Sequence, residues 1–260
     1  MVFDRILLGL DRATWGFSIE EICENLCKIG LDGIELKPEH PELFKNFPNA
    51  SKNLLDILSS YDFKISIHGP FKDLNISSYN PWIRKISLDI FIKTIDFALN
   101  FDKIEYIVFH GGQNSFRSNS RFELKFRKIA LDHTIEAFKI LLQKSKDAGL
   151  LMAIENMTHS DYRMTSKIKY LNLIFAEPEL KDLKFIYDYE HGLNYSERYS
   201  LRILKNFKDR LIGVHIGSDF FKFSHIISDL EPYIVIEPHH FYIEDKIFDK
   251  IKQVKDNIKK

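Results

Sequence analysis

Imidazole and carboxylate side chains stand at the ends of six apolar runs in this sequence. The runs read KISIHGP, YIVFHGG, LMAIENM, KFIYDYEHG, LIGVHIGSD and YIVIEPHH. The residues concerned are His68, His110, Glu155, Asp188 with His191, His215 and Glu237. One such residue alone is ordinary, because a histidine or glutamate at a strand end usually caps a helix or forms an ion pair.

The recurrence has a chemical meaning if the six ends meet in space. Several carboxylates in one apolar-walled cavity are costly to bury unless a cation neutralises them. Imidazole nitrogen and carboxylate oxygen are together suitable ligands for Zn²⁺, Mn²⁺ and related divalent ions. The pattern therefore predicts a divalent metal site.

Lys37, directly after GIEL, is a candidate for contacting a substrate anion, and a surface ion pair is its alternative.

Short apolar runs and helix-like segments alternate along the whole chain. Eight runs are expected as strands: 6–10, 33–36, 64–69, 105–111, 151–156, 184–190, 211–217 and 233–238. Most are continuously apolar, as expected for parallel strands covered on both faces.

Helix start and stop signals occur between these runs. Ser18 with Glu21, and Ser120 with Glu123, have the spacing of a capping box, and Asn80 precedes Pro81 at a predicted helix start. Gly30 and Gly149 are expected to end helices.

Eight strands that alternate with helices predict an α/β fold, a closed (β/α)₈ TIM barrel. An open doubly wound sheet is the alternative, but no G-x-G-x-x-G turn follows any strand. We find no linker or composition break, so residues 1–260 are expected to form a single domain. The connection between strands seven and eight, SDFFKFSHIISDLEP, is short and leaves room for about one helical turn.

Composition narrows the class of protein. Lys plus Arg equals Asp plus Glu at 37 each, and this neutrality gives no support to sequence-independent binding of nucleic acid. No signal peptide and no apolar run long enough for a membrane helix is visible. We therefore expect a cytoplasmic protein without a membrane partner. Its oligomeric state is not indicated.

Six segments in order resemble the xylose isomerase-like barrel superfamily. They read SIHGPFKDLNISS, VFHGG, IENM, YDYEHG, VHIGSD and IEP, and the resemblance extends from GIEL to IEP. That superfamily includes sugar and sugar-phosphate isomerases and epimerases, and also endonuclease IV, a nuclease for abasic-site DNA.

The resemblance to the epimerases implies a divalent-metal-dependent isomerase or epimerase of a sugar or sugar derivative. One Zn or Mn ion would be bound by Glu155, Asp188, His215 and Glu237. Glu155 and Glu237 would also be the catalytic acid/base pair, acting through an enediolate on opposite faces of the sugar carbon. His191 is a further candidate for returning the proton.

The resemblance to endonuclease IV implies an alternative, a zinc phosphodiesterase that acts on abasic-site DNA with two or three ions. Its ligands would be the six strand-end positions and His191, with an Asp-x-His pair after strand seven. In FFKFSHII, His225 matches the histidine, but Phe223 stands in place of the aspartate. Phe71, in GPFKDLN, is a candidate for contacting DNA or substrate, and packing on the barrel rim is its alternative.

Overall fold

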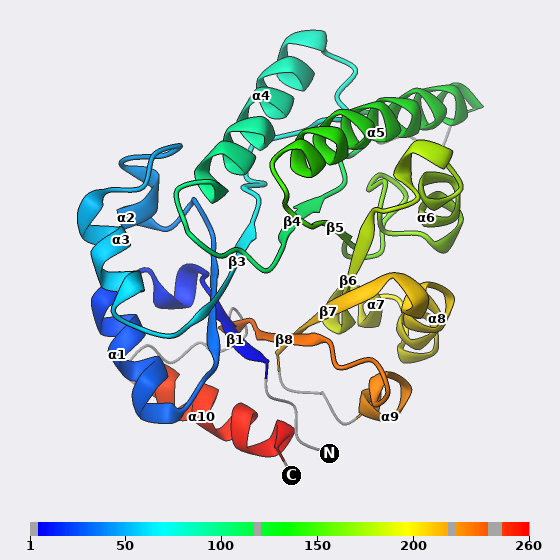
Figure 1. The fold of residues 1–260 in the computed structure, drawn as a ribbon. Coiled ribbons are helices and arrows are strands. Elements are labelled where there is room, and N and C mark those ends of the chain that lie inside the picture. Colours follow the sequence, from blue (N-terminus) through cyan, green and yellow to red (C-terminus); the bar gives the residue numbers. More distant parts are fainter. Residues whose placement is uncertain (1–4, 117–120, 218–221, 239–245, 260) are drawn as a thin grey trace.

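Eight parallel strands close into a barrel in the computed structural model, which describes residues 5–116, 121–217, 222–238 and 246–259 (Figure 1). The strands are β1 (Ile6–Gly9), β2 (Gly33–Leu36), β3 (Lys64–His68), β4 (Ile107–His110), β5 (Met152–Glu155), β6 (Lys184–Asp188), β7 (Leu211–Ile216) and β8 (Tyr233–Ile236). Each predicted run contains one of these strands, and only the run at 105–111 begins two residues too early.

Closure of the barrel is visible in the pairing of β1. Leu7 in β1 is opposite Gly33 in β2 on one side and opposite Val235 in β8 on the other. No strand of the barrel has an open edge, which excludes the doubly wound alternative. The predicted (β/α)₈ fold is therefore confirmed.

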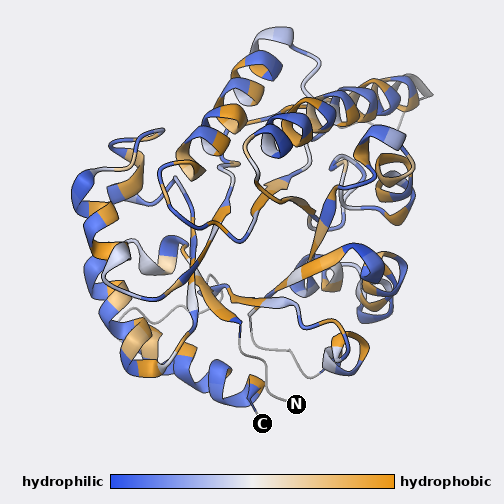
Figure 2. Ribbon diagram, in the orientation of Figure 1, coloured by the Kyte–Doolittle hydropathy of each residue, from blue (hydrophilic) through white to orange (hydrophobic). Residues whose placement is uncertain are grey.

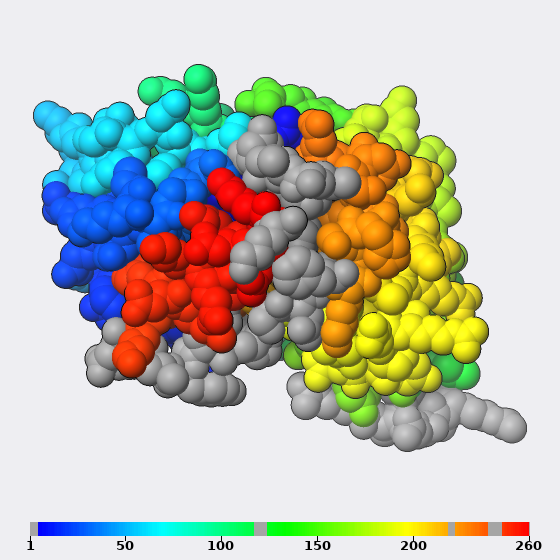
Figure 3. All heavy atoms as spheres, turned by 90° about the horizontal axis from the view of Figure 1, so that it is seen from below, coloured from blue at the N-terminus to red at the C-terminus, as the bar shows by residue number. Residues whose placement is uncertain are grey.

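Helices surround the barrel. They are α1 (Ile19–Ile29), α2 (Pro41–Phe44), α3 (Lys52–Ser59), α4 (Pro81–Ala98), α5 (Arg121–Asp147), α6 (Ile168–Phe175), α7 (Tyr189–Leu193), α8 (Glu197–Phe207), α9 (Ser224–Ile227) and α10 (Ile247–Ile258). The described residues also form three 3₁₀ turns, η1 (Arg12–Thr14), η2 (Pro178–Leu180) and η3 (Lys208–Arg210). From below, α10 lies beside α1 (Figure 3). No helix in the described ranges is both long and apolar enough to span a membrane.

The predicted caps explain where several helices begin and end. The Ser18 hydroxyl accepts from the Glu21 N–H at 3.2 Å, and Glu21 Oε2 accepts from the Ser18 N–H at 2.7 Å. Asn80 Oδ1 accepts from the backbone of Trp82, so both N-caps are confirmed. Gly30 ends α1 with a φ of 69°, in the left-handed region that glycine tolerates. Ser120 lies outside the described residues.

The apolar side chains of the strands pack on two sides, inside the barrel and against the surrounding helices. Figure 2 shows strands coloured mostly hydrophobic and helices with alternating hydrophobic and hydrophilic bands. This is the pattern of a barrel whose strands are covered by amphipathic helices. Between β7 and β8 the described helix, α9, has only four residues, which confirms the short connection.

Candidate metal centre

The parallel barrel brings the polar strand ends together at one mouth, as such barrels do with their functional residues. His68, His110, Glu155 and Asp188 are the last residues of β3, β4, β5 and β6. His215 is the penultimate residue of β7, and Glu237 directly follows β8. All six side chains are buried.

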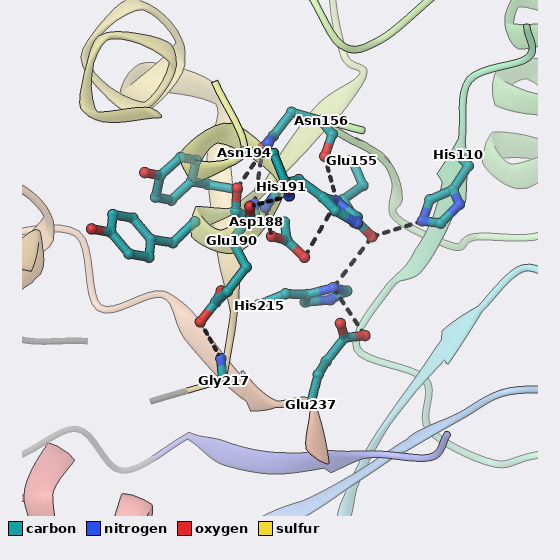
Figure 4. A network of polar contacts seen from close by, with 12 residues as sticks. His110, Glu155, Asn156, Asp188, Glu190, His191, Asn194, His215, Gly217 and Glu237 are labelled. Carbon is teal, nitrogen blue, oxygen red and sulfur yellow. Dashed lines mark hydrogen bonds and ion pairs between the residues drawn. The ribbon is translucent and has the colours of Figure 1, made fainter. Parts of the chain in front are cut away.

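Glu155 lies at the middle of this group (Figure 4). Its Oε2 atom is 3.2 Å from Nε2 of His68 and 3.2 Å from Nε2 of His110. The same oxygen is 3.2 Å from Nδ1 of His215. Its other oxygen, Oε1, is 2.9 Å from Nδ1 of His191. Four imidazoles from four parts of the chain therefore contact one carboxylate.

Two further carboxylates extend the cluster. Glu237 Oε1 is 3.4 Å from Nδ1 of His215, and Asp188 Oδ2 is 3.3 Å from Nδ1 of His191. Potential ligand atoms lie within 4.8 Å of one another in three overlapping groups. The groups are His68, His215 and Glu237; His68, His110 and Glu155; and Glu155, Asp188 and His191.

Asn156 fixes the position of the two strand-end acids. Its Nδ2 donates to the Asp188 carbonyl at 2.8 Å, and its Oδ1 accepts from the Asp188 N–H at 2.9 Å. This reciprocal pair continues the contact of β5 with β6 past the end of the strands. The His191 Nδ1–H donates to the Asn156 carbonyl at 2.8 Å, which also fixes the His191 ring. The amide after Glu155 is thus a positioning residue.

The donor set fits a divalent cation. Nδ1 of His68 is 2.8 Å from the Gly69 carbonyl, which can only accept, so Nδ1 carries the proton. In the neutral ring the lone pair of Nε2 then faces Glu155 Oε2, and the two would repel without a cation between them. His215 adds to this, because its two buried ring nitrogens have carboxylate oxygens of Glu155, Glu237 and Glu35 within 3.4 Å but none of these contacts has hydrogen-bond geometry.

Burial and neighbouring charges set the ionisation of the cluster. Burial raises the pKa of Glu155, but His110 and His215 outweigh it and hold that pKa well below its usual range. Burial lowers the pKa of His110 to about 4, so its ring is neutral at pH 7. For His191 burial acts against the charge, yet Asp188 and then Glu155 raise its pKa to about 9. The centre therefore combines an ionised carboxylate, a neutral imidazole and a protonated one.

Glu35 is a member of the cluster that the sequence analysis missed. It lies inside β2, fully buried, and its Oε1 is 3.3 Å from Nε2 of His215. Its Oε2 accepts from the hydroxyls of Ser66 at 3.1 Å and Tyr106 at 3.0 Å. The signal in the sequence is a charged residue inside the apolar run GIEL, one position before its end. Carboxylates that contact the outer nitrogen of a ligand histidine orient its ring.

Glu190 is a second missed acid, two residues after β6. Its Oε1 accepts from the Gly217 N–H at 2.6 Å, which joins the start of α7 to the segment after β7 (Figure 4). Burial, followed by the charge of Asp188, raises the pKa of Glu190 to about 7. The sequence signal was the acidic residue in DYEH.

Lys37 and Phe71 border the cluster. Lys37 is 7% exposed and its Nζ lies 2.5 Å from Glu237 Oε1, so the pair is buried rather than a surface ion pair. The Phe71 ring lies on the rim, with its centre 4.7 Å from that of His110. Both residues line a cavity of about 330 Å³ that also reaches Glu155, Glu237 and His191.

His225 and Phe223 lie away from the cluster. His225 is exposed on α9 and belongs to none of the ligand groups found among the described residues. Phe223 is fully buried, with its ring 5.4 Å from that of Tyr187 and 5.1 Å from that of Tyr189. Where endonuclease IV would place an aspartate, this chain has an aromatic packing residue.

Comparison with known sequences decides the family. Residues 23–255 match the xylose isomerase-like TIM barrel. The chain belongs to that family. Among curated proteins, this xylose isomerase-like barrel is 27% identical over 174 residues to "Uncharacterized protein MJ1614" of Methanocaldococcus jannaschii. The match covers 66% of this chain and 62% of that relative, so it spans less than two thirds of the relative's length. "Uncharacterized protein MJ1188" of the same organism is 24% identical over 225 residues, which cover 85% of this chain and 79% of that protein.

Solved structures share the fold of this xylose isomerase-like barrel. A D-tagatose 3-epimerase-like protein superimposes with a TM-score of 0.75 at 19% identity, covering 98% of each chain. D-psicose 3-epimerase from Clostridium cellulolyticum H10, solved with D-tagatose, gives 0.73 at 13% identity, also covering 98% of each. The IOLI protein with a zinc atom gives 0.75 at 11% identity, covering 98% of this chain and 97% of that one. At these identities the similarity shows the fold.

Proposed function

We propose that this xylose isomerase-like barrel is a divalent-metal-dependent isomerase or epimerase of a sugar or sugar derivative. The observation that carries the proposal is the placement of Glu155 and Glu237. Both carboxylates line the same cavity, and His215 Nδ1 lies between them at 3.2 Å and 3.4 Å. Two carboxylates at one small-molecule cavity can remove a proton from a sugar carbon and return one.

The residues that would hold the ion are Glu155, Asp188, His215 and Glu237, and their nitrogen and oxygen donors suit Zn²⁺ or Mn²⁺. When bound, a divalent ion polarises a substrate carbonyl and its neighbouring hydroxyl, which lowers the free energy of the enediolate. The zinc atom of the IOLI protein and the ketose epimerases among the structural neighbours support this assignment.

The protein side chains would supply the proton transfers. Glu155, whose low pKa keeps it ionised, is placed to accept a proton from the substrate carbon. Glu237, which pairs with Lys37, would exchange a proton at the opposite face of that carbon, and His191 is a candidate donor because its pKa is about 9. Proton transfer by a positioned group contributes roughly 10²–10⁴-fold to a rate.

We expect this reaction to exchange a substrate proton with solvent. In heavy water, the metal-loaded protein should incorporate deuterium at the carbon next to the carbonyl of a ketose, as measured by NMR. A parallel sample with an abasic oligonucleotide tests for strand cleavage. Cleavage of the oligonucleotide, without exchange into any ketose of a broad panel, would contradict the proposal.

One observation favours a second candidate, a zinc phosphodiesterase of the endonuclease IV type. His68, His110 and Glu155 form one of the three overlapping ligand groups, and an epimerase with one ion would not need the two histidines as ligands. Two or three ions could generate hydroxide and stabilise both the attacking and the leaving oxygen. Against this candidate stand Phe223 at the aspartate position, the exposed His225 and the absence of net positive charge.

A further inference from the structure

Beyond the metal-centre residues and Lys37, three cations and two carboxylates line the 330 Å³ cavity. The cations are Arg12, Lys72 and Arg163, the carboxylates are Asp11 and Glu39, and of these Arg12 and Lys72 are exposed. Arg12 belongs to η1 after β1, and Lys72 belongs to the segment after β3. Arg12 and Lys72 therefore come from loops at the same mouth as the metal centre, but on the side of β1 and β3.

Arg12 and Lys72 have no carboxylate partner in the described part of the chain. The Lys72 ammonium instead lies 4.0 Å from the centre of the Trp15 ring, a cation–π contact. Glu39 Oε1 is engaged by the backbone, since it accepts from the N–H groups of Phe71 at 2.9 Å and Lys72 at 3.1 Å. These bonds fix the Lys72 backbone at the cavity while its positive charge stays uncompensated by an anion.

Trp15 positions the Lys72 ammonium at the cavity. It lines the same cavity as Arg12 and Lys72, and its ring makes the cation–π contact with Lys72. Its indole Nε1 is buried, so this N–H group does not face the cavity. Two cations without a carboxylate partner among the described residues are thus available in the cavity wall.

We infer that the sugar bound at this site carries an anionic group, a phosphate or a carboxylate, which Arg12 and Lys72 bind at the outer end of the cavity. Only the identification of the ligand as a sugar rests on the proposed function. A cavity of this volume suits a small molecule. Arginine and lysine both bind such anions through charge-assisted hydrogen bonds. The anion would lie beside the loops after β1 and β3, whereas many barrels bind phosphate after strands seven and eight.

Anion binding can be measured without any turnover. Calorimetric titration of the metal-loaded protein with inorganic phosphate, and separately with acetate, should show which anion binds more tightly. In the double variant Arg12→Gln, Lys72→Gln the dissociation constant of that anion should rise about tenfold or more, as expected for the loss of two charge-assisted bonds. The control is Lys52→Gln, Arg198→Gln, which removes two exposed cations outside the cavity. Equal affinity in both double variants, or no binding of either anion, would overturn the inference.

Turnover adds an arm that separates the two proposals. The ratio of kcat/KM for a ketose phosphate or keto-sugar acid to that for the uncharged ketose should be about ten or more in the wild type, and should fall in the Arg12/Lys72 variant. No exchange into any sugar, with anion binding still dependent on Arg12 and Lys72, would remove the proposed function and keep the anion subsite. Exchange that favours uncharged ketoses in every variant would remove the anion subsite and keep the function.

Discussion

Replacing Glu155 and Glu237 together with glutamine is expected to abolish proton exchange, with a fall in kcat/KM of about 10⁴-fold or more, beyond what one proton-transfer group contributes. Glutamine keeps the shape of each side chain but cannot accept a proton at neutral pH. Glu155 also contacts four imidazoles, so its replacement removes the negative charge on which they converge. The measurement is deuterium incorporation into the ketose, followed by NMR.

The matched control is Glu177→Gln. Glu177 is a partly exposed carboxylate that pairs with Lys139 at 2.7 Å, in the connection between α6 and β6 that leads to the opposite end of the barrel from the metal centre. Its loss should leave exchange within about twofold of the wild type, because surface ion pairs contribute little to stability. Thermal unfolding of each variant establishes that the protein is folded. A folded double variant that still exchanges protons, or still cleaves DNA, would remove both candidate mechanisms.

Glu35→Gln is expected to weaken metal binding about 10–100-fold, although Glu35 belongs to none of the ligand groups found among the described residues. Its Oε1 lies 3.3 Å from His215 Nε2, and a neutral amide there no longer stabilises the charge or orientation of that ring. The introduced amide can keep an oxygen toward Ser66 and Tyr106, so we expect the fold to persist. The measurement is competition for Zn²⁺ or Mn²⁺ with a chelator of known affinity.

A truncation separates metal affinity from folding. Glu35→Ala leaves His215, Ser66 and Tyr106 without their shared buried partner, which should lower the free energy of unfolding by about 3–5 kcal/mol. Glu35→Gln should lower it much less. Unchanged metal affinity in a folded Glu35→Gln protein would show that the carboxylate does not act on His215.

The sequence predicted the barrel and the strand-end part of the site because both depend on local patterns. Parallel strands must be covered on both faces, so their runs are continuously apolar, and their carboxyl ends must meet at one mouth. His68, His110, Glu155 and Asp188 could be placed on that basis. Their positions at the ends of parallel strands were sufficient to predict that these residues lie together, without knowledge of any side-chain contact.

The remaining contacts depend on packing between distant segments. Glu35 lies inside β2, and only the neighbouring side chains of β3, β7 and the segment before β4 show that it faces the cluster. For Lys37 the alternative to contacting a substrate anion was a surface ion pair, but its partner is Glu237 from the other end of the chain and the pair is buried. No local sequence pattern predicts that Phe223 packs among aromatic rings.

Metal content per chain tests the central claim most directly. We expect the purified protein, reconstituted with excess Zn²⁺ or Mn²⁺ and then desalted, to retain about one ion per chain by mass spectrometry, as a site of four protein ligands would. His225→Ala should retain the same content, and Glu155→Gln should lose the ion. A wild-type chain that retains no divalent ion would contradict the account. Two or three zinc ions per chain would favour the nuclease over the epimerase.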